Sequence, residues 1–209
     1  MSAVAARAPG SLTVVVFEGQ SLNLRSSMLF GVDPWPYRLM AGRGLPWATV
    51  ALDNASWTDL LTGTDAAAGQ PSSTRLHPIA QVSSAAKKIL VLCGGQTDLN
   101  GEGDSGTQVF ADLVANAQAA RTAGFTHVIA TTIPGSSTYD SGEEIARNDH
   151  NTLLLADAGG DFDGVVDLTV TSLDTHNDTD FWDVIHLSAI GADKLADAAD
   201  PVLDTVLAA

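Results

Sequence analysis

The chain has 209 residues, enough for one domain with a substantial core, and 45% of them are hydrophobic. Its formal net charge of −15 argues against nucleic-acid binding, because phosphates would be repelled. The charge is uneven: residues 1–88 hold seven Lys and Arg against five Asp and Glu, and residues 89–209 hold three against twenty. An acidic outer surface that favours solubility is the simplest interpretation.

The single cysteine, Cys93, rules out an intrachain disulfide, and its place at the end of an apolar segment predicts a core position. No stretch approaches the ~20 apolar residues of a membrane span. Residues 1–10 lack the apolar core of a signal peptide, so we expect a flexible lead there and a single domain over residues 11–209. The sequence indicates a soluble protein and leaves its compartment and oligomeric state open.

Short apolar segments bounded by Gly, Asp, Asn or Pro are typical of buried parallel strands. The candidates are Leu12–Phe17, Ala48–Leu52, Lys88–Cys93, Thr126–Thr132 and Gly164–Leu168. Helical periodicity or helix-start signals alternate with them, at Pro34–Ala41, Ser56–Leu61, Gly106–Ala123, Ser141–Ala156 and Ser188–Leu207. This alternation predicts an α/β fold, a three-layer α/β/α domain with a five-stranded parallel sheet. Pro201 should kink or split the last helix, and residues 63–78 should form a long surface loop.

The first predicted strand ends in Glu18-Gly19-Gln20-Ser21-Leu22. In an open parallel sheet, ligands bind at the carboxyl ends of the strands. A serine at this turn is well placed to be a nucleophile if the chain supplies a base. Asp183 and His186 supply one candidate, since they lie three residues apart just before the last helix and reach the same edge of the sheet.

Two other patterns imitate binding motifs. Residues 101–106 match G-x-G-x-x-G, but they begin eight residues after Cys93 and carry two acids where a pyrophosphate would lie. Residues 98–104 look like the first half of a calcium loop, but Val109 occupies the twelfth position, where a bidentate Glu is needed. We therefore interpret this stretch as an acidic loop without a ligand.

Three blocks in order resemble the SGNH/GDSL hydrolase superfamily: residues 18–22, Gly94-Gly95-Gln96-Thr97-Asp98-Leu99, and residues 183–187. The resemblance covers nearly the whole chain. It implies a flavodoxin-like five-stranded sheet and a serine esterase or lipase activity that needs no metal or cofactor. It further implies Ser21 as the nucleophile, His186 as the base and Asp183 as its orienting partner.

The chain departs from the family pattern at three positions. Gln20 replaces the usual Asp, as in the carbohydrate-acetylesterase branches. The glycine that lends a backbone N–H to the oxyanion hole falls on Asn54, which tolerates left-handed backbone better than most residues. Thr97 replaces an asparagine donor, and the neighbouring Gln96 could substitute for it.

These patterns leave two hypotheses. The first is a serine ester hydrolase that acts on a small acyl group, with a carbohydrate as the preferred alcohol on the evidence of Gln20. The alternative is a non-catalytic glycan-binding or assembly module whose oxyanion hole has decayed at Asn54 and Thr97. In either case Trp182, beside Asp183, is the aromatic side chain expected to touch the ligand.

Overall fold

The computed structural model describes residues 13–24, 33–63, 71, 76, 80 and 87–209. The predicted lead at residues 1–10 lies outside the described residues, as does most of the predicted loop at residues 63–78. Among the helices of the described part, none is long and apolar enough to cross a bilayer.

Five parallel strands form one sheet in the order β2-β1-β3-β4-β5. Their bounds are Thr13–Gly19 (β1), Trp47–Thr49 (β2), Lys87–Cys93 (β3), His127–Thr131 (β4) and Gly164–Val166 (β5). The predicted five-stranded parallel sheet is therefore confirmed, and its order is that of flavodoxin-like folds.

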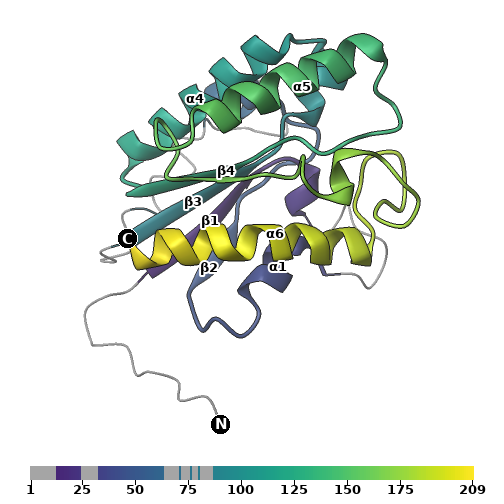
Figure 1. Ribbon diagram of the computed structural model, residues 1–209. Helices are drawn as coiled ribbons and strands as arrows, with labels where there is room; N and C mark the ends of the chain where they lie inside the picture. The colour runs from purple at the N-terminus through teal and green to yellow at the C-terminus, as the bar shows by residue number, and fades with distance from the viewer. Residues whose placement is uncertain (1–12, 25–32, 64–70, 72–75, 77–79, 81–86) are drawn as a thin grey trace.

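The described helices follow the predicted pattern closely. They are Trp35–Met40 (α1), Trp57–Thr62 (α2), Gly106–Ala123 (α4), Ser141–Ala156 (α5) and Ala189–Ala208 (α6). The expected split at Pro201 does not occur, because α6 continues through it as one helix (Figure 1). Pro201 lies on the exposed side, while Leu195, Ala199 and Leu203 on the other side bury the helix against the sheet.

Two helical layers cover the two faces of the sheet (Figure 1): α1 and α6 on one side, and α2, α4 and α5 on the other. The side chains of β3 show how the sequence divides between them. Ile89, Val91 and Cys93 belong to the core beneath α1 and α6, whereas Leu90 and Leu92 belong to the opposite core. Cys93 is fully buried, as expected.

The carboxyl ends of β1 and β3 meet more closely than ordinary side chains would allow. A Cβ atom on Gly19 would lie 1.9 Å from the carbonyl oxygen of Cys93, and the φ of Gly19 is +134°. Glycine is therefore required at this position. β1 lies between β2 and β3, at the point where the strand order reverses and where ligands bind in such sheets.

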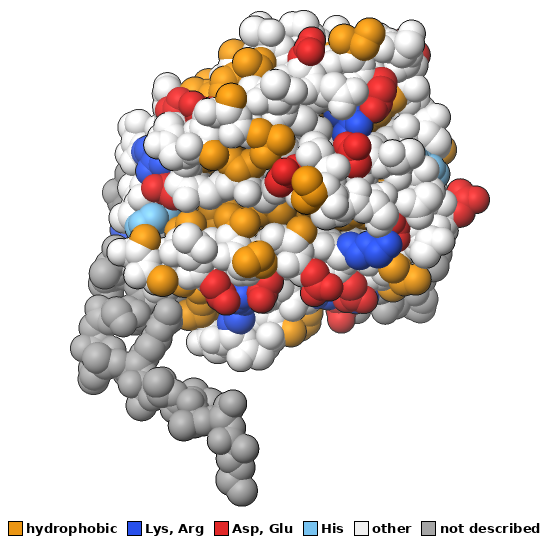
Figure 2. Space-filling model, viewed as in Figure 1, with side chains coloured by type: hydrophobic (Ala, Val, Ile, Leu, Met, Phe, Trp, Pro, Cys, Tyr) orange, Lys and Arg blue, Asp and Glu red, His pale blue; other side chains and the backbone are white. Residues whose placement is uncertain are grey.

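Acidic side chains lie beside the few basic ones on the face seen in Figure 2. Arg43 of the α1–β2 connection forms ion pairs with Asp200 and Asp204 of α6, and Arg38 of α1 pairs with Asp193. These pairs tie α1 to α6. Because the carboxylates are more than half exposed, each pair contributes little to stability.

His150 of α5 is a buried histidine that packs against α4. Its ring is fully buried, lies edge-on to Phe110 and has no hydrogen-bond partner among the described residues. Burial lowers the pKa of His150 from 6.5 to about 4. Between these values the unfolded chain binds a proton that the folded chain does not, so the free energy of unfolding falls as the pH drops.

We predict that His150→Leu flattens this pH dependence, because leucine cannot titrate. The free energy of unfolding of the wild type relative to the variant should fall by about 3 kcal/mol between about pH 7 and about pH 4. Urea unfolding across this range measures the difference. His127→Gln, at a half-buried ring, is the control and should change the slope less; parallel curves for wild type and His150→Leu would contradict the prediction.

Candidate active site

Ser21 begins a single 3₁₀ turn, Ser21–Asn23, directly after β1. The backbone N–H of Gln20 donates to the Cys93 carbonyl at 3.2 Å. The Asn23 side chain donates to the same carbonyl at 2.9 Å and accepts from the indole N–H of Trp35, also at 2.9 Å. All of these groups are buried. The turn that presents Ser21 is therefore anchored on the end of β3.

The structure brings Ser21, His186 and Asp183 into one chain of contacts. The Oγ of Ser21 lies 3.0 Å from Nε2 of His186, and Nδ1 of that ring lies 2.8 Å from Oδ2 of Asp183. Oδ1 of Asp183 accepts the backbone N–H groups of Ile185 and His186 at 2.9 and 2.6 Å. The carboxylate thus orients the ring and also closes the loop that carries it.

These contacts determine where the imidazole holds its proton. Burial by itself would raise the pKa of Asp183, but the hydrogen bonds from His186 and the Ile185 N–H outweigh burial and hold it below its usual value. An ionised carboxylate can only accept, so the neutral ring carries its proton on Nδ1. Nε2 is then left as the acceptor that faces the hydroxyl of Ser21.

A second aspartate, Asp180, connects the loop that carries Asp183 to the neighbouring elements. Its side chain is 1% exposed and forms an ion pair with Lys194 of α6 at 2.7 Å. Its other oxygen accepts from Ser172 and Asn177 at 2.6 and 3.0 Å. Burial opposes ionisation, but these three donors lower the pKa of Asp180 below its usual value. Asp180 thus ties the loop before Asp183 to the last helix.

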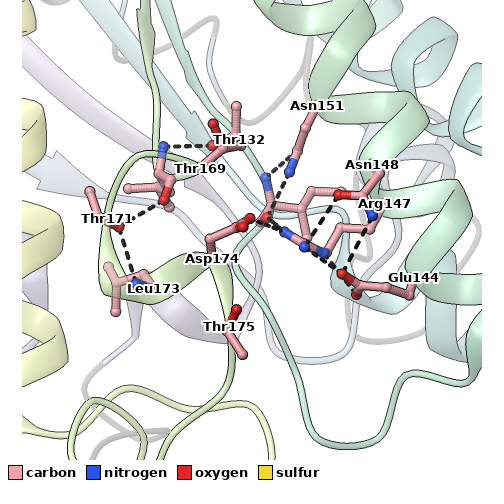
Figure 3. A network of polar contacts seen from close by, with 12 residues as sticks. Thr132, Glu144, Arg147, Asn148, Asn151, Thr169, Thr171, Leu173, Asp174 and Thr175 are labelled. Carbon is pink, nitrogen blue, oxygen red and sulfur yellow. Dashed lines mark hydrogen bonds and ion pairs between the residues drawn. The ribbon is translucent and has the colours of Figure 1, made fainter.

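Arg147 of α5 anchors the start of the same loop (Figure 3). Its guanidinium is 2% exposed and contacts Asp174 at 2.9 Å and Glu144 at 2.6 Å. It also donates to the Ile133 carbonyl at 3.1 Å, and Asn151 pairs with the backbone N–H and carbonyl of Ile133. The loops that follow β4 and β5 are therefore held by one buried network.

Aromatic rings flank His186 and Asp183. Trp182, 42% exposed, stacks on the His186 ring with centroids 5.9 Å apart and planes at 18°. His176 contacts the Asp183 carbonyl through Nε2 at 2.8 Å and stacks on Phe181. Nothing in the sequence spacing marks His176, because its contact depends on the path of the loop.

The predicted oxyanion residues differ in placement. Asn54 is exposed and has a φ of 54°, the only positive φ among the described residues other than glycine. The left-handed backbone expected of a glycine substitute is therefore present. Thr97 is half-buried, and Gln96 is buried. Gln20 is 1% exposed and its side-chain amide is hydrogen-bonded to Asp98 and to the backbone N–H of Gln96, so this side chain is internal.

The acidic stretch interpreted as a loop without a ligand begins with one turn of π-helix, Asp98–Glu102. Both carboxylate oxygens of Asp98 accept N–H groups, from Gln20 and Trp57. In the described part of the chain no three His, Cys, Asp or Glu side chains gather as metal ligands would.

Solved structures share this architecture. A member of the lipolytic protein G-D-S-L family from Veillonella parvula matches with a TM-score of 0.70 over 92% of this chain and 98% of that one, at 18% identity. The chain has the SGNH hydrolase fold. No family model and no curated protein matches the sequence.

Two further SGNH-fold neighbours are esterases of sugars or acetyl groups by name. A carbohydrate esterase family 3 protein from Talaromyces cellulolyticus matches with a TM-score of 0.67 and 13% identity, over 95% of this chain and 100% of that one. An acetyl esterase variant with an acetate ion has the same score and identity, over 93% and 98%. The resemblance read from the three sequence blocks is thus confirmed as a fold.

The two loop aspartates should respond differently to conversion to asparagine. Asp180→Asn removes a buried charge that pairs with Lys194, so we expect the free energy of unfolding to fall by about 2 kcal/mol. Asp183→Asn should change it by less than about 1 kcal/mol, because the side chain is partly exposed and an amide oxygen can still accept both backbone N–H groups. Urea unfolding of both variants at neutral pH tests the difference; equal losses would refute it.

Proposed function

We propose that the protein is a serine ester hydrolase with Ser21 as nucleophile, His186 as general base and Asp183 as the orienting carboxylate. The observation that carries the proposal is the continuous contact from Ser21 Oγ through both ring nitrogens of His186 to Asp183. Nucleophile, base and orienting group at hydrogen-bond distance are the geometric signature of covalent catalysis.

In the proposed reaction, Ser21 Oγ attacks the ester carbonyl carbon while Nε2 of His186 takes the hydroxyl proton. The oxyanion collapses, the bond to the alcohol breaks, and His186 returns the proton to the leaving oxygen. Water then attacks the acyl-enzyme and gives a proton to His186; the bond to Ser21 Oγ breaks, His186 returns the proton to Oγ, and the acid is released. The stacked indole of Trp182 favours the imidazolium that forms in both steps through a cation–π interaction.

We further propose that the oxyanion is bound by the backbone N–H groups of Ser21 and Asn54, with Thr97 as a third donor. The left-handed φ of Asn54 supports its part, because glycine is the residue that usually adopts this backbone. Among the described residues, the Thr97 hydroxyl has no hydrogen-bond partner and is available to an oxyanion. The buried Gln96 is the weaker candidate, since its side chain is 2% exposed.

A small acyl group, as acetyl on a carbohydrate, is the proposed substrate class. The carbohydrate esterase and the acetyl esterase among the fold neighbours support it. Gln20 supports it only as a sequence feature, because its side chain is buried away from the ligand. The exposed part of Trp182 offers an aromatic platform of the kind that binds sugar rings.

Replacing the nucleophile tests the reaction directly. Ser21→Ala should lower kcat on p-nitrophenyl acetate by at least about 10³-fold and abolish labelling by a fluorophosphonate probe, because Ser21 Oγ is the atom that forms the acyl-enzyme in the proposed reaction. The ester series from acetyl to octanoyl tests the acyl preference, with acetyl expected to be fastest. Equal rates for wild type and Ser21→Ala, with no labelling of the wild type, would favour the non-catalytic glycan-binding module instead.

Thr97 offers a gain-of-function test. Thr97→Asn should raise kcat by about tenfold or more, because an amide donor reaches further than a hydroxyl and one oxyanion donor is worth about 10²–10³ in rate. Thr97→Val, which keeps the shape but removes the hydroxyl, should lower kcat. Steady-state kinetics with the preferred ester measure both variants; no change in either would remove Thr97 from the oxyanion hole.

A further inference from the structure

Asp98 lies at the centre of a buried hydrogen-bond network that the proposed reaction does not use. Its side chain is fully buried. Oδ2 accepts the amide N–H of Gln20 at 2.8 Å, and Oδ1 accepts the backbone N–H of Trp57 at 2.8 Å. The Gln20 amide oxygen in turn accepts the backbone N–H groups of Gln96 and Thr97 at 3.0 and 3.3 Å.

Each contact leads to one of the proposed oxyanion donors. Gln20 directly precedes Ser21, Asp98 directly follows Thr97, and Trp57 begins α2 three residues after Asn54. One carboxylate therefore joins the end of β1, the start of α2 and the turn after β3. A shift in any of these elements would move a donor relative to the others.

We propose that Asp98 is a positioning residue that holds the oxyanion donors in register through Gln20 and Trp57. This inference rests on the proposed hydrolase function. It also gives Gln20 a role: its amide presents a donor to Asp98 and an acceptor to the turn after β3. Catalysis by such donors requires that they be held in place before the charge develops, which is what a buried, fully hydrogen-bonded carboxylate provides.

The direction of each hydrogen bond in the network allows a specific test, because Asp98→Asn cannot keep all of them. In Asp98→Asn, the new amide can accept from Trp57 only by turning its N–H₂ group toward the N–H₂ group of Gln20. If Gln20 flips to accept that donor, its N–H₂ group meets the N–H groups of Gln96 and Thr97. In either arrangement two N–H donors face each other without an acceptor between them. Burying such donors costs free energy because neither can form its hydrogen bond.

The reciprocal exchange restores every contact and reverses the polarity of the bond between residues 20 and 98 alone. In Gln20→Glu/Asp98→Asn, one oxygen of the new carboxylate accepts from Gln96 and Thr97, and the other accepts the amide of residue 98. The oxygen of that amide still accepts from Trp57. The double variant has the same number of hydrogen bonds and the same net charge as the wild type, so it isolates the geometry of the network.

Gln20→Glu alone places two carboxylates against each other, and they can coexist only when they share a proton. Burial already raises the pKa of Asp98 to about 7, and among the described residues the titratable groups that interact with it are Asp104 and Tyr139. The kcat of Gln20→Glu relative to wild type should therefore fall as the pH rises from about 6 to about 9. A purely packing role would leave this ratio constant.

The experiment measures kcat and KM on p-nitrophenyl acetate, with urea unfolding, for wild type, both single variants, the double variant and Ser21→Ala. We expect Asp98→Asn to lose about 100-fold in kcat with a smaller change in KM, and the double variant to return within about tenfold of wild type. Glu102→Gln, an exposed acid of the same loop, is the matched control and should retain wild-type kinetics.

The outcomes separate this inference from the function on which it rests. Equal rates for wild type and Ser21→Ala would overturn both. If Ser21→Ala loses activity but Asp98→Asn keeps the wild-type kcat, the positioning role is overturned. It is also overturned if the double variant regains stability without regaining kcat, because Asp98 is then a packing residue. If the double variant does not fold, the pH dependence of Gln20→Glu decides: a falling ratio supports the proposal and a constant ratio overturns it.

Discussion

The close approach of β1 and β3 at their carboxyl ends is the constraint on which the site depends. Gly19 has no room for a Cβ beside the Cys93 carbonyl, and that carbonyl also accepts the Gln20 N–H and the Asn23 side chain. The turn that carries Ser21 is therefore built on the neighbouring strand rather than on its own sequence. Because the two strands run parallel, the turns that follow them lie at the same edge of the sheet, as the proposed oxyanion hole requires.

Buried charged side chains fix the loop that carries Asp183 and His186. Asp180 and Arg147 are almost fully buried and each has several partners, and together they tie the loop that ends at His186 to α5 and α6. A buried charge left without its partner is costly, so such networks favour one arrangement of the loop over others. Asp183 and His186 remain partly exposed, which is compatible with the proton transfers that we propose for His186.

Gln20 and Asp98 connect these supports to the proposed chemistry. The residue that the sequence linked to a substrate class is buried, and its amide joins the nucleophile turn to the turn after β3. An exchange of residue type at position 20 therefore alters the donors and acceptors of an internal hydrogen-bond network, and it does not act through direct contact with a substrate. Its effect on the reaction, in our interpretation, is exerted through the placement of the oxyanion donors.

The amino-acid sequence was enough to predict the α/β class, the five strands, the bounds of α4 and α5, and the pairing of Ser21 with His186 and Asp183. Each follows from local signals: apolar periodicity, helix caps, and the rule that parallel strands present their ends at one edge. Three features required the folded structure: α6 continues through Pro201, Gln20 is internal, and His176 contacts the Asp183 carbonyl. These depend on contacts between residues distant in sequence or on the path of a loop, which no local pattern encodes.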